Sequence, residues 1–184
     1  MNITKEYIKE EIITEDYIRE VVGTIECTGD ERIELTNFFT INRTDESSIE
    51  FFATLKYSKP RTTHTYEWRM MKNKNGGYPD YFAYTIIKNA KTGKHVDRSI
   101  NTTKVTDKIL YTVCSRLKKD TNLNVSPDLL EIKRFLKFLG TDHQCYNYSV
   151  EYFVDLQERL GINPQSIIDP RKDILGLVDT LNLF

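Results

Sequence analysis

The chain has 184 residues, of which 26 are Lys or Arg, 27 are Asp or Glu, and 39% are hydrophobic. This length supports one compact domain, or one domain with a small appendage, and the composition excludes a collagen, a coiled coil and a wholly disordered or membrane-embedded chain. The N-terminal residues mix both signs of charge and lack the apolar stretch of a secretory signal. Three widely separated cysteines are typical of reduced thiols, so we expect a cytoplasmic protein without a membrane partner.

Residues 1–22 are predicted to form two short helices. Thr4 and Thr14 suit the N-cap position, acidic residues follow in each first turn, and Gly23 is a stop signal. After this glycine the hydrophobic pattern changes from helical to alternating.

Two strands are predicted from alternation between apolar and polar residues. Residues 33–42 alternate with a break at Asn37 and Phe38, and residues 49–57 alternate with an interruption only at Phe52. A period of two places the apolar side chains of each strand on one face of a sheet.

Three further strands are predicted over residues 64–72, 80–88 and 95–101. Turn signals rich in Asn, Lys and Gly separate them. Short connections between successive strands favour an antiparallel meander of about five strands over a parallel sheet.

The turn over residues 89–94 predicts a register. If it pairs residues whose numbers add up to 183, Lys88 lies opposite His95 and Tyr84 opposite Ser99, on the face that we take as the binding face. A shift by one residue would send the same rings into the core, because side chains alternate between the two faces.

The C-terminal half is predicted to be helical. Apolar residues recur every four positions over residues 105–118, which predicts a helix that covers one face of the sheet. A polar linker over residues 118–127 follows, with Ser126 as the cap and Pro127 in the first turn of the next helix. Three helices are predicted in the remainder, the first of which ends at Gly140.

These elements predict an α+β fold in two parts. Residues 1–119 would form an α+β domain of N-terminal helices, sheet and covering helix. Residues 120–184 would form a small helical subdomain.

The charges are distributed unevenly along the chain. Residues 1–55 carry a net charge of −8, residues 56–119 a net charge of +11 and residues 120–184 a net charge of −4. A local excess of cations of this size is typical of segments that neutralise phosphates.

Aromatic residues are interleaved with these cations. A sheet that presents rings for stacking beside Lys and Arg for phosphates suits single-stranded nucleic acid or unpaired RNA. The sequence therefore predicts a non-enzymatic protein whose central sheet contacts nucleic acid or a nucleoprotein. The candidate binding residues are Lys56, Lys59, Arg61, Tyr66, Trp68, Arg69, Lys72, Lys74, Tyr84, Lys88, Lys91, Lys94 and Arg98.

A structural interpretation of the same residues stands beside the functional one. Tyr, Phe and Trp favour strands and cores, and lysines at turn tips are usually solvated. Basic residues at sheet edges also deter aggregation. The hypothesis requires the cations of separate hairpins to meet in one patch.

The sequence contains no recognisable catalytic, metal-binding or cofactor-binding motif, and we expect no cofactor. Metal ligands would come from three histidines and three cysteines, of which only His143 and Cys145 are close in sequence. Zinc sites normally show recurring ligand pairs, so neither residue is assigned to a metal.

A metal-dependent nuclease is the alternative enzyme hypothesis, because such a site needs only a few carboxylates and a lysine. Glu67 should face Thr54, with Lys56 nearby. The acidic residues on the predicted strands are Glu50, Glu67, Asp80 and Asp97.

The leading alternative, from a different class, is a protein-binding inhibitor or adaptor, such as an accessory protein of a phage or mobile element. Its acidic N-terminal region would dock on the basic groove of a nucleic-acid enzyme. Glu10, Glu11 and Glu15 would make that contact.

Overall fold

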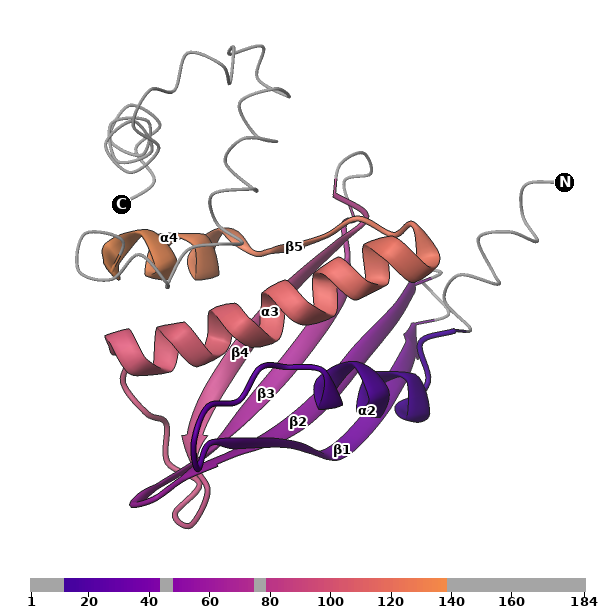
Figure 1. Ribbon diagram of the computed structural model, residues 1–184. Coiled ribbons are helices and arrows are strands. Elements are labelled where there is room, and N and C mark those ends of the chain that lie inside the picture. The colour runs from indigo at the N-terminus through magenta and orange to yellow at the C-terminus, as the bar shows by residue number, and fades with distance from the viewer. Residues whose placement is uncertain (1–11, 44–47, 75–78, 139–184) are drawn as a thin grey trace, which may run out of the picture. The chain divides into compact units, whose positions relative to one another are not determined.

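The computed structural model describes residues 12–43, 48–74 and 79–138 (Figure 1). The fold is α+β, as predicted. The chain divides into two compact units: Met1–Asp97 with Lys108–Ser126, and Arg98–Asp107 with Pro127–Phe184. The predicted division after residue 119 stays a prediction.

A five-stranded sheet dominates the first unit, and its strands are ordered as they occur in the chain. The first four strands form the predicted antiparallel meander. The five strands are β1 (Arg32–Arg43), β2 (Ser48–Lys59), β3 (Thr62–Lys72), β4 (Tyr81–Asn89) and β5 (Val125–Pro127).

The prediction of a fifth strand over residues 95–101 is wrong. Lys88 and His95 do form an antiparallel bridge, so the predicted register is correct next to the turn. The pairing stops there because a helix begins at Ile100, and Ser99 therefore does not face Tyr84 as a strand residue.

The fifth strand is instead β5, which neighbours β4 and lies in the segment predicted as a polar linker. All three of its residues are buried. Ser126 is thus a strand residue, and the next helix is capped by Asp128, whose Oδ1 accepts a hydrogen bond from the Glu131 amide at 2.9 Å.

A two-residue turn joins β2 to β3, since Lys59 pairs with Thr62. Pro60 has a backbone angle suited to the first turn position. Arg61 follows with a φ of 74°, a left-handed conformation that residues other than glycine rarely adopt. The same pairing places Glu67 opposite Thr54, as predicted.

A β-bulge interrupts β1 at Thr36. Leu35 pairs with Leu55, but Asn37 pairs with Thr54, so Thr36 has no partner of its own in β2. Because of the extra residue, odd-numbered side chains face the core before the bulge and even-numbered side chains face it afterwards. This change accounts for the break in alternation that the sequence shows at Asn37.

Helix α2 (Glu15–Gly23) and the part of helix α3 (Ile100–Thr121) from Lys108 onward lie on the same face of the sheet (Figure 1). Thr14 caps α2 as predicted, because its hydroxyl accepts a hydrogen bond from the Tyr17 amide at 3.2 Å. The first predicted helix of residues 1–22 falls largely outside the described residues. Side chains buried in this unit include Ile18, Val21, Phe51, Leu55, Tyr66, Trp68, Met70, Ile109, Leu110 and Leu117.

The second unit contains the start of α3 and the helix α4 (Leu129–Phe138). Ser99 and Thr102 bond reciprocally at the start of α3, which explains why this helix begins before the predicted residue 105. Arg98 is paired with Glu131 at 2.8 Å. The second and third predicted C-terminal helices lie outside the described residues.

In the described ranges, no helix is both long and apolar enough to cross a membrane.

Candidate functional site

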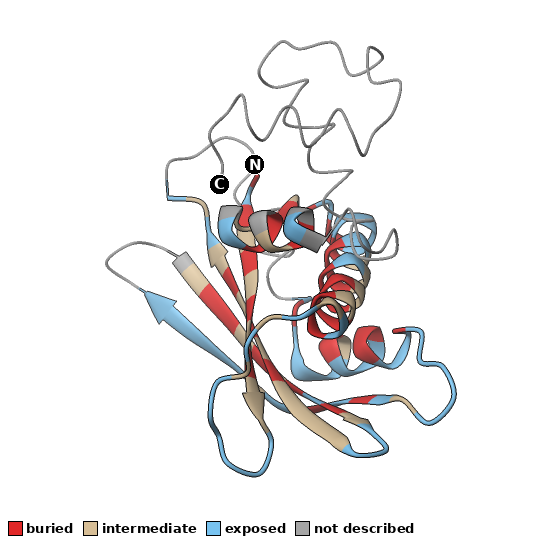
Figure 2. Ribbon diagram, turned by 90° about the vertical axis from the view of Figure 1, so that its left-hand side faces the viewer, coloured by how far each residue is buried: buried red, intermediate tan, exposed pale blue. Residues whose placement is uncertain are grey.

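The sheet face opposite α2 and α3, hereafter the open face, is lined by side chains that alternate with those of the core. Buried and intermediate residues alternate over residues 65–71 of β3 and along most of β4 (Figure 2). No described element of this unit covers the open face (Figure 1). Tyr84 and Lys88 lie on it, as the predicted register required.

A row of aromatic rings and one guanidinium crosses the open face on four strands. Phe39 of β1 pairs with Phe52 of β2, Phe52 with Arg69 of β3, and Arg69 with Tyr84 of β4. The two phenylalanine rings are stacked, with centroids 4.7 Å apart and planes 4° from parallel. The guanidinium carbon of Arg69 lies 4.9 Å from the Phe52 centroid and 5.9 Å from the Tyr84 centroid. We call these four residues the ring row.

The ring row is partly accessible to solvent. Phe39 is 46% exposed, and the other three residues are half-buried. Planar groups that stay accessible on a sheet can stack against flat ligands such as nucleobases.

Glu50 fixes the guanidinium of the row in place. Its Oε2 accepts a hydrogen bond from Nη2 of Arg69 at 2.8 Å, and its Oε1 accepts one from Nε of Arg43 at 3.0 Å. Burial alone would raise the pKa of Glu50, but hydrogen bonds and attraction from Arg43 and Arg69 lower it below the ordinary value of 4.5. Nη1 of Arg69 donates to the Tyr84 hydroxyl at 3.0 Å. The guanidinium is therefore held by contacts on both of its neighbouring strands.

A group of cations gathers at the end of the sheet where β2 turns into β3. The Ala90 amide donates to the Thr63 carbonyl at 3.2 Å, which places the turn after β4 beside the turn after β2. Both turns carry exposed cations, and within the described part of the chain none of these makes an ion pair. We call Lys59, Arg61, Lys91 and Lys94 the turn-end cations.

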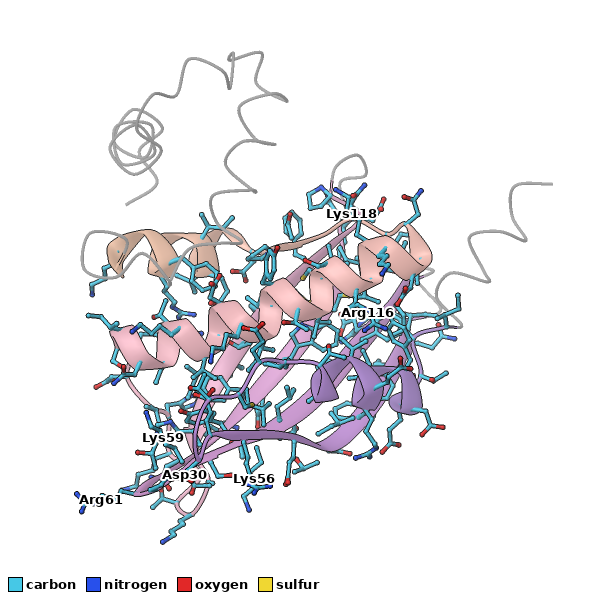
Figure 3. The ribbon with its side chains drawn as sticks, viewed as in Figure 1. Asp30, Lys56, Lys59, Arg61, Arg116 and Lys118 are labelled. Atoms are coloured by element: carbon cyan, nitrogen blue, oxygen red, sulfur yellow. The ribbon has the colours of Figure 1, made fainter. Side chains whose placement is uncertain are left out.

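Figure 3 shows Lys56, Lys59 and Arg61 at this end of the sheet, with Asp30 beside them. Lys56 is on the open face but pairs in register with Glu34 of β1. Burial lowers the pKa of His64 below its ordinary value of 6.5, so this histidine adds no charge at neutral pH. The positive charge here is therefore carried mainly by the turn-end cations.

Two of the predicted binding residues lie on the core face instead. Tyr66 and Trp68 are 1% and 2% exposed, because β3 directs its even-numbered side chains toward the helices. Their rings are inaccessible for stacking, and we leave both out of the candidate surface.

The remaining predicted cations do not join one patch. Lys72 and Lys74 follow β3 toward the opposite end of the sheet, about 30 Å from its first residue at 3.3 Å per residue. Arg98 belongs to the second unit, where it bonds Glu131 and Thr106. The single contiguous patch expected from the sequence is thus replaced by a smaller cluster at one end.

Three of the four carboxylates of the nuclease hypothesis are engaged elsewhere. Glu50 is bound by two arginines, and Glu67 pairs with Lys88 at 3.1 Å. Asp80 accepts a hydrogen bond from the Asn124 amide at 2.9 Å, and Asp97 is exposed. Among the described residues, no three acidic, histidine or cysteine side chains are grouped so that they could hold a metal ion.

The acidic contact of the inhibitor hypothesis lies mostly outside the described residues. Glu10 and Glu11 fall there, and Glu15 pairs with Arg19 one turn later in α2 at 2.8 Å. His143 and Cys145 also fall outside. Of the described cysteines, Cys27 is exposed and Cys114 is buried.

Sequence reasoning missed Phe39 and Phe52 as surface residues. Phe52 interrupts the alternation of its strand, and Phe39 follows the break in β1. An aromatic residue out of phase with the core pattern was the available signal for a ring on the open face.

Comparison with known protein families, with characterised proteins and with solved structures found no match to this chain.

Proposed function

We propose that the chain is a non-enzymatic protein that binds single-stranded nucleic acid along the open face of its sheet. A base would stack on a ring at either end of the ring row, where Phe39 and Tyr84 lie, and the turn-end cations would neutralise phosphates. The observation that carries the proposal is the ring row itself, in which Phe39, Phe52, Arg69 and Tyr84 adjoin across four strands.

The charges support a single path for the strand. Glu50 bonds both Arg69 and Arg43 and offsets one of their two positive charges, so this part of the surface offers less charge to phosphates than the two turns do. The turn-end cations lie toward one end of the same sheet. A nucleic-acid strand would therefore run along the length of the sheet, crossing the ring row at one of its ends, with its backbone passing the two turns.

Single strands are favoured over duplexes for a geometric reason. Bases in a duplex are stacked on each other and present only their edges, whereas unpaired bases can lie flat on exposed rings. Stacking on planar groups is open to every base, which favours binding with little sequence preference.

Fluorescence anisotropy tests the proposal with labelled DNA and RNA strands of about 12 nucleotides, titrated over a range of salt concentrations. Tyr84→Ala should weaken binding about 5-fold to 100-fold, the range expected when one base is no longer stacked. Reversing Lys59 and Arg61 to Glu should weaken binding and reduce the salt slope by about 0.7 for each phosphate that is no longer neutralised.

The matched control reverses Lys118 and Lys119, two exposed lysines at the far end of α3. This control should bind like the unmodified chain, because its charges lie away from the two turns (Figure 3). Absence of binding at low salt, or equal losses of affinity in the control and the turn variant, would overturn the proposal.

A further inference from the structure

We propose that two copies of this chain associate through β1, whose exposed half pairs antiparallel with β1 of the second copy about a two-fold axis at Thr40. The pairing needs no nucleic acid and goes beyond the proposed function. The proposal is argued from the unpaired backbone edge of β1 together with the side chains exposed on that strand.

β1 is an edge strand, and only its first half is covered. Arg19 of α2 donates from Nη1 to the Leu35 carbonyl at 3.2 Å, which occupies a backbone acceptor of this edge. After the bulge the strand is exposed to solvent. From Asn37 to Arg43 every residue is exposed except Phe38, which is half-buried.

Apart from the bulge at Thr36, the exposed half lacks the features that protect most edges. Natural edge strands carry lysines, prolines or inward-pointing charges, or are very short. Residues 36–42 contain no charge, glycine or proline and include two phenylalanines and an isoleucine. The other edge, β5, is three buried residues long. Of the two edge strands, β1 is therefore the one that can pair with a strand of another chain.

The stretch from the bulge to the end of β1 is self-complementary about its middle residue. An antiparallel pair centred on Thr40 places Phe39 of one copy opposite Ile41 of the other, and a two-fold axis makes the contact twice. Phe39 and Ile41 are 46% and 38% exposed and share the open face. Aromatic and β-branched side chains are a favourable cross-strand pair.

The flanking positions are compatible with the same register. Phe38 would face Asn42, and Asn37 would face Arg43, so no like charges meet. A centre at Phe39 would instead run into the bulge and the Arg19 contact after fewer pairs. The axis at Thr40 uses every residue of the exposed half.

The paired stretch is short. Standard stable interfaces use about 20–30 residues on each side, so we expect a weak dimer with a dissociation constant in the micromolar range. In the dimer, two five-stranded sheets would join edge to edge, with their ring rows on the same side.

Sedimentation velocity of the full chain over a concentration series, without nucleic acid, tests the dimer. The unmodified chain should convert from monomer to dimer, and Ile41→Glu should weaken this at least about tenfold by placing a carboxylate against Phe39 of the second copy. The matched control is Leu130→Glu in α4, which changes another exposed apolar residue and should leave the dimer intact. Circular dichroism checks that both variants fold.

Disulfide trapping tests the register in a Cys27→Ser background. Thr40→Cys should form a covalent dimer under mild oxidant, because the two cysteines face each other at the axis. Thr92→Cys, an exposed turn residue away from β1, should not.

A chain that stays monomeric at all concentrations, or equal trapping of the two cysteine variants, would overturn the inference. An edge that instead accepts an extended peptide from another protein would also give a monomer. Because Tyr84→Ala tests nucleic-acid binding and Ile41→Glu tests association, failure of one proposal is distinguishable from failure of the other.

Discussion

Arg69 and Glu50 form an ion pair 2.8 Å long on the exposed side of a sheet, where Glu50 is nevertheless only 5% exposed. The carboxylate is buried because side chains of β1 and β3 close over it, and both of its oxygens are bonded to arginines. Loss of this one acid would leave two guanidiniums without their shared partner.

Glu50→Gln should therefore lower the free energy of unfolding by about 1–3 kcal/mol, less than for a fully buried pair because both arginines keep contact with water. Urea unfolding measures the change. Glu67→Gln is the control, since the Glu67 pair with Lys88 is more exposed and should cost less than about 1 kcal/mol. Equal costs would mean that Glu50 does not organise this face.

Acid should destabilise the fold through Glu31 and Glu50. Burial alone would raise the pKa of Glu31, but hydrogen bonds from Lys108 and Tyr57 lower it below 4.5, and the pKa of Glu50 is lowered as well. Because the unfolded chain then binds more protons, this stability is complete above about pH 4.5 and is lost as pH falls through the lower folded-state values.

The measurement is urea unfolding at several pH values between about 6 and 3. Replacing both residues by Gln should flatten the decline in unfolding free energy over this range. An unaltered slope in the double variant would contradict the assignment.

The two faces of the sheet should respond differently to loss of a phenylalanine. Phe51→Ala removes a ring that is 1% exposed and should cost about 3–5 kcal/mol of unfolding free energy. Phe39→Ala should cost only about 1 kcal/mol, because its ring is half in water and the change removes mainly the stacking on Phe52. Thermal unfolding at low protein concentration compares the two, and similar costs would show that Phe39 is part of the core.

Arg61 should be suboptimal for stability at its position. Its φ of 74° strains a residue with a side chain, so Arg61→Gly should raise the unfolding free energy by about 0.5–1 kcal/mol after the entropy cost of glycine. The same change removes a turn-end cation and should weaken binding of single strands.

Arg61→Asn is the matched variant, because asparagine tolerates the left-handed conformation without carrying charge. It should bind single strands as weakly as Arg61→Gly. Chemical unfolding and anisotropy measure the two effects, and a gain in both stability and affinity would contradict a binding role for Arg61.

Much of the sheet was predictable because its signals are local. Alternation defined β1 and β2, and turn signals defined β3 and β4, each to within a few residues. The turns also fixed the pairing of Thr54 with Glu67 and of Lys88 with His95. β5 could not be found this way, since three residues in a polar segment carry no period. Its place depends on how α3 returns the chain to β4.

The candidate surface was less predictable, although one error was avoidable. In β3, Tyr66, Trp68 and Met70 alternate with polar residues, which already indicates that these rings face the core. The ion pair of Glu50 with Arg69 depends on register across two strands, and the separation of the cations depends on the direction of each hairpin. The net charge of a segment predicts neither the register nor the direction.

The bulge at Thr36 determines which chemistry the outer half of β1 presents. Ile33, Leu35, Phe39 and Ile41 are all odd-numbered, and an uninterrupted strand would bury them together. One additional backbone unit divides them between the hydrophobic interior and the solvent. Deletion of Thr36 would leave both sets on their present faces, whereas pairing of Thr36 with Thr54 would turn Phe39 and Ile41 inward. The backbone conformation at one residue therefore decides which side of the strand carries the apolar groups.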